Sequence, residues 1–160
     1  MIWEELDKNL IHLHMDAATP NEVFEQLGGA LIERGYSKDT YVDALKEREA
    51  QFPTGLDIQG FGVAIPHTDA GYVMKETEGI ATLKHPVKFI QMGSDDTPVM
   101  IKVVFMLAIE DPKTHIKKLQ QILRIIQDKA VLERIYEADS NEEVIDIIKQ
   151  KEIEIGGENL

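Results

Sequence analysis

Cysteine is absent from this chain of 160 residues. Its absence excludes a disulfide framework, a thiol nucleophile and a thiolate metal site. Basic residues are few, since 17 lysines and arginines stand against 29 aspartates and glutamates, and the formal net charge is −12. A protein that binds the phosphate backbone of a nucleic acid needs a basic face, so this charge argues against such a partner. An acidic surface instead suits a partner whose own surface is basic.

Long apolar runs and low-complexity linkers are missing as well. No run approaches the roughly 20 apolar residues of a membrane span. The segment Met1–Glu5 lacks the basic leader and apolar core of a signal peptide. We therefore expect a cytoplasmic protein. The 43% hydrophobic and 29% charged contents are typical of a globular chain with one domain.

Strand and helix patterns alternate along the whole chain. Apolar and β-branched runs predict strands over 10–15, 63–65, 79–83, 87–89 and 99–109. Helical spacing and capping residues predict helices over 20–34, 38–50, 113–127, 130–136 and 144–149. This alternation predicts a single α/β domain with a mixed β-sheet flanked by helices. We expect the domain to span 1–155 and a flexible tail to occupy 156–160.

The stretch from Phe52 to Asp69 has the clearest features of a functional site. It opens with a Pro-Thr-Gly turn and contains two glycines that flank Phe61, which we expect either in the core or at a contact surface. A short apolar run then stops at Pro66, which lacks the N–H that a central strand needs. His67 follows at once, held by a rigid strand yet presented at the sheet edge, where ligands of α/β proteins bind. The alternative is an ordinary loop histidine.

An imidazole that is neutral near pH 7 can serve as a nucleophile, a general base or a metal ligand. A hydrolase needs a serine or cysteine nucleophile, and the three serines of the chain lie in turn or cap contexts. A metal site needs a recognisable set of ligands. His12 and His14 alternate in the first predicted strand as a candidate metal pair, but no further ligand is fixed beside them, which favours a half-buried strand face.

The remaining scheme uses the imidazole itself as the acceptor of a phosphoryl group. Such a site needs donors for the phosphoryl oxygens and a group that holds the second ring nitrogen. Arg48, Thr54 and the backbone N–H groups of the glycine-rich turn are the candidate donors. His115 is a second imidazole that could share the charge.

Three segments in order, Arg48-Glu49, Pro53-Thr54-Gly55 and 62–69, resemble the phosphoacceptor region of one family. They are similar to enzyme IIA proteins of the bacterial phosphoenolpyruvate-dependent sugar phosphotransferase system, in the fructose/mannitol superfamily. The Pro-His-Thr-Asp ending and the Met-Gly-Ser-Asp-Asp turn look most like the galactitol-type branch. His115 falls where the family has its second active-site histidine. Thr68 differs from the glycine that many members have after the first histidine.

The resemblance implies a carrier of phosphoryl groups rather than a sugar-binding enzyme. His67 would accept the group from the phosphocarrier protein HPr, with Arg48 and His115 as the other catalytic residues and Thr54 as a substrate-binding residue. The group would pass to a cysteine of an enzyme IIB partner, which phosphorylates sugar as it enters through the membrane component IIC. No metal or organic cofactor is implied. The alternative is a regulatory IIA-like protein that signals by its phosphorylation state without a sugar partner.

Overall fold

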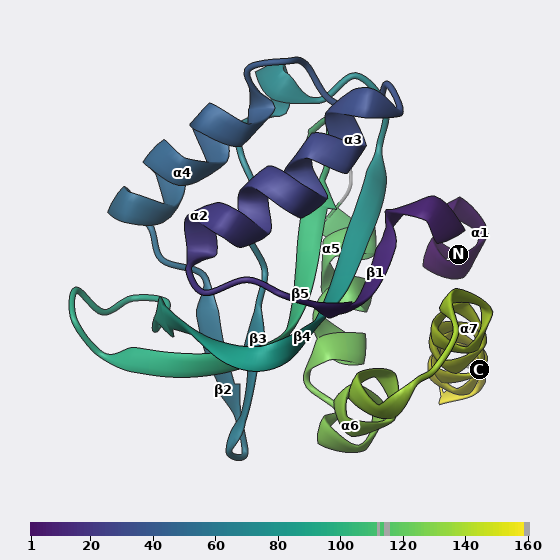
Figure 1. The fold of residues 1–160 in the computed structure, drawn as a ribbon. Coiled ribbons are helices and arrows are strands. Elements are labelled where there is room, and N and C mark those ends of the chain that lie inside the picture. The colour runs from purple at the N-terminus through teal and green to yellow at the C-terminus, as the bar shows by residue number, and fades with distance from the viewer. Residues whose placement is uncertain (112, 114–115, 159–160) are drawn as a thin grey trace.

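The computed structural model describes residues 1–111, 113 and 116–158, and its centre is a sheet of five strands (Figure 1). The strands are β1 (Ile11–Met15), β2 (Gly55–Ile58), β3 (Phe61–Ala64), β4 (Thr77–Ile90) and β5 (Pro98–Ala108). Their spatial order is β1-β4-β5-β3-β2. The pairs β1–β4 and β3–β5 are parallel, whereas β4–β5 and β2–β3 are antiparallel. The predicted α/β fold with a mixed sheet is confirmed.

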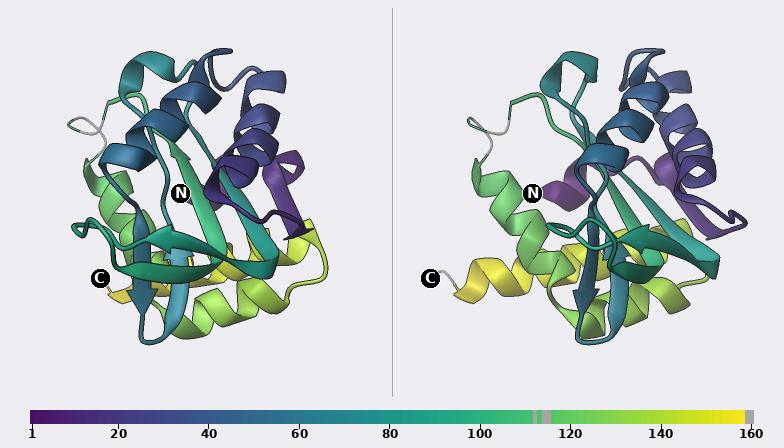
Figure 2. Two further views of the ribbon diagram at one scale, coloured as in Figure 1. Left: turned by 60° about the vertical axis from the view of Figure 1, so that its left-hand side comes forward. Right: turned by 90° about the vertical axis from the view of Figure 1, so that its left-hand side faces the viewer.

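Helices cover both faces of the sheet, as the two further views in Figure 2 show. One layer contains α2 (Pro20–Val23), η2 (Phe24–Gly28), α3 (Gly29–Glu33) and α4 (Tyr41–Gln51). The other contains α1 (Ile2–Glu5), α5 (Ile116–Ile126), α6 (Lys129–Glu137) and α7 (Asn141–Glu158). Two short 3-10 turns, η1 (Lys8–Leu10) and η3 (Ala70–Tyr72), lie in the connections.

From Val103 to Ala108, strand β5 is buried on both faces, which explains the continuous apolar sequence of this half. Alternate side chains along a strand point to opposite faces. Phe105 and Leu107 pack with α5, α6 and α7, whereas Met106 and Ala108 pack with the layer of α2 to α4. The sheet therefore separates two hydrophobic cores, and β5 contributes to each of them.

The first long helix follows its predicted limits and contains one irregular turn. Thr19 caps it by accepting a hydrogen bond from the Glu22 N–H at 3.2 Å, and Pro20 occupies the first turn. The π-helical turn η2 joins α2 to α3 without ending the helix. The helix stops at Gly35, whose φ of 82° is the left-handed conformation that glycine adopts readily.

Three secondary-structure predictions need correction. The runs 79–83 and 87–89 belong to the single strand β4, because a register shift between Thr82 and Val87 lets the ladder bend around the intervening residues instead of breaking. Strand β2 was not predicted. It pairs with β3, and a tight turn at Gln59 and Gly60, whose φ values are both positive, connects the two strands. Helix α7 continues to Glu158, well past the predicted end near 149.

The first and last helices are joined by a buried carboxylate. Glu152 of α7 is fully buried and accepts hydrogen bonds from the N–H groups of Ile2 at 2.9 Å and Trp3 at 2.6 Å. Gln121 of α5 donates a third bond at 2.6 Å. Because the first N–H groups of a helix have no partner within it, a carboxylate at this place satisfies them and complements the helix dipole.

A second carboxylate on the same side of the sheet, Glu78 of β4, lacks such donors. It is 1% exposed, and neither of its oxygens has a hydrogen-bond partner among the described residues. The Lys118 ammonium lies 4.0 Å away. Burial raises the pKa of Glu78 to about 8, and Lys118 acts in the opposite direction. Glu78 is therefore mostly protonated at neutral pH.

The proton on Glu78 predicts how stability depends on pH. Above about pH 6 the unfolded chain has released this proton while the folded protein keeps it, so stability falls as pH rises through about 8. Between about pH 6 and pH 9 we expect the free energy of unfolding of the wild type to fall by about 3 kcal/mol more than that of the neutral variant Glu78→Gln. Urea unfolding at several pH values measures both slopes. Parallel slopes would contradict the assignment.

Gly62 of β3 gives a second prediction, because it lies where β3 meets β5. A Cβ on Gly62 would overlap the backbone carbonyl of Met100, whereas a Cβ on Gly29 would enter open space. We expect Gly62→Ala to lower the free energy of unfolding by about 1–3 kcal/mol. The control Gly29→Ala, on the surface of a helix, should raise it by about 0.5–1 kcal/mol. Equal stability of the two variants in urea would show that the approach of β3 to β5 is not tight.

Candidate functional site

His67 lies at the edge of the sheet, three residues beyond the end of β3. The Pro66 carbonyl accepts a hydrogen bond from the Leu107 N–H at 2.9 Å, so the segment stays paired with β5 up to the histidine. The His67 Nδ1 lies 2.9 Å from the carbonyl oxygen of Ile65. A carbonyl can only accept, so this contact needs the proton on Nδ1 and leaves the lone pair on Nε2. The ring is half-buried.

Arg48 reaches this segment from the last turn of α4. Its Nη1 donates to the Asp69 carboxylate at 3.1 Å, and Asp69 is only two residues from the histidine. The guanidinium carbon lies 4.9 Å from the centre of the Phe52 ring, within the range of a cation–π contact. The Arg48 Nε–H is buried and has no acceptor among the described residues.

These side chains line a small cleft of about 150 Å³. Its lining consists of Ala44, Glu47, Arg48, Gln51, Phe52, Asp69 and Tyr72. The structure therefore brings Arg48 to the loop that follows His67, as the sequence led us to expect. A guanidinium with one buried N–H unused is suited to bind an added anion.

Thr54 is 2% exposed, and its side chain faces α4. Its hydroxyl donates to the Glu49 carboxylate at 2.5 Å, and its backbone N–H donates to the same oxygen at 3.2 Å. Its carbonyl accepts a hydrogen bond from the Ile65 N–H at 3.2 Å. The Thr54 hydroxyl would have to change partner before it could donate to a phosphoryl oxygen.

Glu49 is a residue whose contacts the sequence reasoning missed. Its place directly after Arg48 was visible, but nothing local to the sequence shows that its carboxylate turns inward toward Thr54. Burial raises the pKa of Glu49 to about 7, and the two hydrogen bonds from Thr54 act in the opposite direction. Glu49 is therefore a mixture of ionised and neutral forms at neutral pH.

Two other predicted residues have different outcomes. His115 lies outside the described residues, so its place beside His67 stays a prediction. Phe61 is 4% exposed and packs edge-to-face on Tyr136 with ring centres 6.0 Å apart, so it belongs to the core. The exposed aromatic near the site is Phe52, which is 58% exposed.

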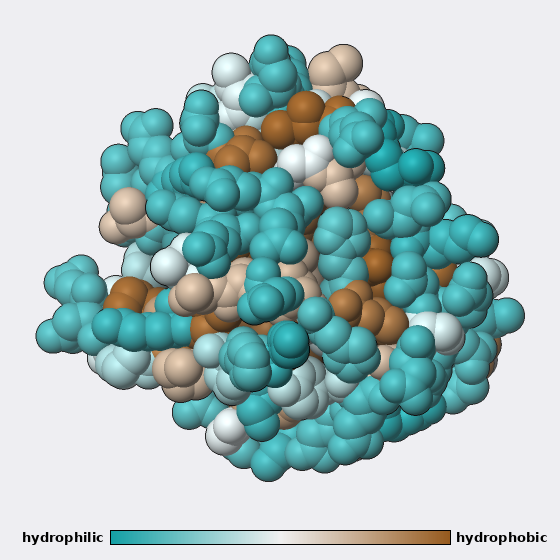
Figure 3. Space-filling model, viewed as in Figure 1, coloured by the Kyte–Doolittle hydropathy of each residue, from teal (hydrophilic) through white to brown (hydrophobic). Residues whose placement is uncertain are grey.

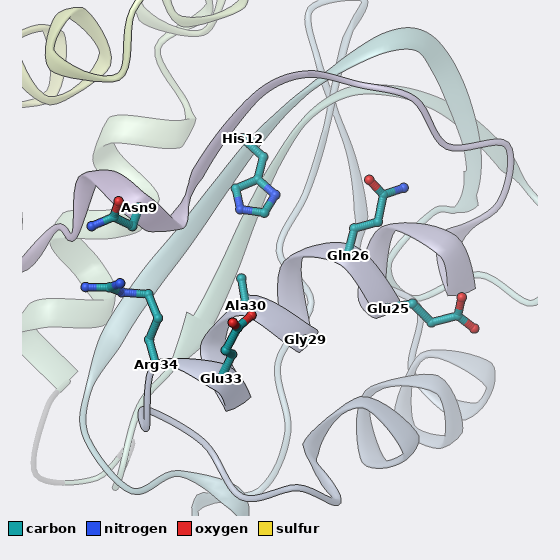
Figure 4. Close-up of a pocket in the computed structure, with 8 residues that line it drawn as sticks. All are labelled: Asn9, His12, Glu25, Gln26, Gly29, Ala30, Glu33 and Arg34. Atoms are coloured by element: carbon teal, nitrogen blue, oxygen red, sulfur yellow. The ribbon is translucent and has the colours of Figure 1, made fainter.

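A wider hollow of about 770 Å³ lies away from these residues, along the edge strand β1 (Figure 4). It is lined by Asn9, His12, Glu25, Gln26, Gly29, Ala30, Glu33 and Arg34. The β4 and β5 strands separate β1 from β3 and its histidine. Among the described residues, no three His, Asp or Glu side chains are grouped to hold a metal ion. Size alone therefore does not make this hollow the better candidate site.

The outer surface has few apolar side chains on the side that carries α2 and α4. Figure 3 shows this face as mostly hydrophilic, with apolar residues in small separate patches. Within the described ranges, no helix combines the length and the hydropathy that crossing a membrane requires.

The fold and the site define an α/β protein with a histidine at the edge of its sheet and an arginine nearby. The family model described as "Phosphoenolpyruvate-dependent sugar phosphotransferase system, EIIA 2" matches residues 4–151. The chain therefore belongs to this family of enzyme IIA components, which are phosphotransferase proteins that carry phosphoryl groups. The family predicted from the sequence motifs is confirmed.

Known relatives agree with this assignment. The galactitol-specific EIIA component of Escherichia coli is 30% identical over 115 residues, which cover 72% of this chain and 76% of that protein. The nitrogen regulatory protein IIA-Ntr of Neisseria meningitidis has a TM-score of 0.73 and 29% identity, covering 92% and 98% of the two chains. Mannitol enzyme IIA of Escherichia coli, solved in complex with phosphorylated mannitol enzyme IIB, has a TM-score of 0.72 and 25% identity, covering 89% and 95%.

Proposed function

We propose that this chain is a phosphohistidine carrier for sugar uptake. In this proposal His67 accepts a phosphoryl group from HPr and passes it to a cysteine of an enzyme IIB, which works with the membrane component IIC. The observation that carries the proposal is the contact between His67 Nδ1 and the Ile65 carbonyl, because it puts the proton on Nδ1 and the nucleophilic lone pair on Nε2 at the sheet edge. We place the reaction in the cytoplasm, where phosphoenolpyruvate is made.

The transfer needs two displacements at phosphorus. In the first, the Nε2 lone pair of His67 forms a bond to phosphorus while the bond to the donor nitrogen of HPr breaks, and the electron pair leaves with that nitrogen. In the second, the IIB thiolate attacks phosphorus and the bonding pair returns to Nε2. In both steps the proton stays on Nδ1, which keeps its hydrogen bond to the Ile65 carbonyl. Such transfers depend mainly on positioning and on stabilising charge.

We assign to Arg48 the role of stabilising the negative charge of the phosphoryl group. Its present partner is the exposed carboxylate of Asp69, and exposed ion pairs contribute little stability. A phosphoryl group on His67 would compete for the same guanidinium with more charge and with oxygens placed for two parallel hydrogen bonds. In this proposal His115 assists the transfer, and Thr54 supports the phosphoryl site.

The partner and the sugar rest on the relatives. The complex of mannitol enzymes IIA and IIB supports an enzyme IIB as the acceptor. The galactitol-specific relative supports a galactitol-type sugar. The similarity to the nitrogen regulatory protein favours a second function, in which the phosphorylation state is a signal and no sugar is transported. Removal of the phosphoryl group by a galactitol-type enzyme IIB would favour the transport function.

The site of phosphorylation is tested with labelled phosphoenolpyruvate, enzyme I and HPr. We expect one adduct per chain that is labile in acid and stable in base, with phosphorus on Nε2 in ¹⁵N and ³¹P spectra. The variant His67→Ala should lose the label. The control His85→Ala, which removes an exposed imidazole of β4, should keep it. Label that persists in His67→Ala, or that sits on a hydroxyl, would refute the proposal.

Arg48 should affect the rate of transfer and leave the fold intact. We expect Arg48→Ala to slow phosphorylation by HPr about 100-fold, the size of effect seen when a donor to a developing anion is removed. Arg48→Lys should recover only part of the rate, because an ammonium cannot make the bidentate contact. Arg34→Ala, which removes an arginine from the distant hollow, is the control in rapid-quench measurements. Equal rates for Arg48→Ala and Arg34→Ala would remove Arg48 from the site.

A further inference from the structure

We propose that Glu49 is a positioning residue for the transfer, acting on His67 through Thr54 and the end of β3. The inference rests on the proposed function, since it names what holds the histidine in place. It assigns to the carboxylate an influence on the reaction that depends on pH.

The contacts form a continuous series from α4 to the imidazole. The Glu49 carboxylate holds both the hydroxyl and the N–H of Thr54, at 2.5 and 3.2 Å. The Thr54 carbonyl accepts the N–H of Ile65 at 3.2 Å. The Ile65 carbonyl lies 2.9 Å from His67 Nδ1 and fixes both the tautomer and the direction of the ring. The series therefore connects the end of α4 to the imidazole through the segment that follows β3.

The turn that Glu49 contacts is also anchored at its two ends, by the Phe52 N–H on the Arg48 carbonyl and by the pairing of Gly55 with Ala64. It connects α4 to β2, and Phe52 within it is exposed. Among the described contacts, every donor to the Glu49 carboxylate comes from Thr54. Loss of this carboxylate would therefore leave the Thr54 hydroxyl and N–H without their acceptor and weaken the hold on the middle of the turn, whose carbonyl is bonded to Ile65.

Ionisation of Glu49 sets the strength of this hold. A carboxylate accepts hydrogen bonds about twice as strongly as a neutral group, so the ionised form fixes Thr54 more firmly. Burial raises the pKa of Glu49 to about 7, which places the change of charge in the neutral range. The ionised fraction grows as pH rises, and the positioning effect should grow with it.

The other charged groups beside Glu49 are basic side chains of α4 and β4. The hollow beside it is lined by Lys46 of the same helix and by Lys88 of β4, while the start of α2 contributes only uncharged residues. Lys46 is bonded to Glu25 at 2.7 Å. Neighbouring Arg48 is directed to Asp69. Among the described residues that line this hollow, Glu49 has the one carboxylate, and burial places its pKa in the neutral range.

The test compares the wild type with Glu49→Gln, which copies the shape of the neutral acid. Second-order rate constants for transfer from phosphorylated HPr are measured at about pH 6, 7 and 8. Dividing the two rate constants at each pH removes the pH effects that the two proteins share. We expect the rate constant of the wild type to exceed that of Glu49→Gln by about two-fold or less near pH 6 and by about ten-fold near pH 8. The control Asp43→Asn, which removes an exposed carboxylate from the same helix, should give a ratio near one throughout.

Thr54 variants test the path of the effect. Thr54→Ser keeps the hydroxyl. In this background, Glu49→Gln should therefore lower the rate of transfer with the same pH dependence as it does in the wild type. Thr54→Val removes the hydroxyl and should flatten that pH dependence, as expected when two residues act as a unit. A ratio that stays constant with pH, or one that Thr54→Val leaves unchanged, would overturn the proposal.

A spectroscopic measurement decides the matter even where a variant fails to fold. In the wild type, the amide signals of Thr54 and Ile65 should shift with a midpoint near pH 7, because the Glu49 carboxylate contacts the first and acts through it on the second. Absence of this titration would contradict the inference. Failure of the wild type to accept phosphate from HPr would instead refute the proposed function, and the amide titration would still report on the link between Glu49 and Thr54.

Discussion

The parallel pairing of β3 with β5 is the constraint on which the candidate site depends. It requires Gly62, because any side chain there would overlap the Met100 carbonyl of β5. It continues past the end of β3 to the hydrogen bond between the Leu107 N–H and the Pro66 carbonyl. Since β5 is buried on both faces from Val103 to Ala108, two hydrophobic cores fix its position there, and the pairing transfers that rigidity to His67. The histidine thus lies at one edge of the sheet but is supported by a strand packed on both sides.

Pro66 has two consequences at this edge. It cannot donate a hydrogen bond to a neighbouring strand, so regular pairing ends there, yet its carbonyl still accepts one from β5. The chain can then turn toward solvent immediately after a firmly held residue. The same turn carries Asp69 to the guanidinium of Arg48, which comes from a different layer of the fold. Pro66 and the ion pair between Arg48 and Asp69 therefore place α4 beside the segment that follows β3, where the small cleft lies.

Much of this could be read from the sequence, because local rules decide it. The cap at Thr19, the continuous apolar run of β5 and the stop at Pro66 each follow from short-range chemistry, and the motif around His67 identified the family. The rest depends on partners distant in the chain. The direction of the Glu49 carboxylate depends on Thr54 and on burial, and the burial of Phe61 depends on Tyr136, 75 positions later. The continuity of β4 was missed because its bulge is supported by β5, which a local reading of His85 and Pro86 does not include.

Burial raises the pKa of two carboxylates, Glu78 and the partly buried Glu49, and the pair illustrates why burial alone does not indicate a role in function. Glu78 has the higher pKa, about 8, but no described residue donates a hydrogen bond to it and its lysine neighbour is 4.0 Å away, so its proton affects stability. Glu49 has the smaller shift, to about 7, yet its oxygens hold a turn whose backbone is bonded toward His67. Among the described contacts, Glu78 has no comparable series of hydrogen bonds to the histidine. What separates the two is therefore the connection of each carboxylate to the reactive group, and this connection makes Glu49 the one that can tune a reaction at the sheet edge.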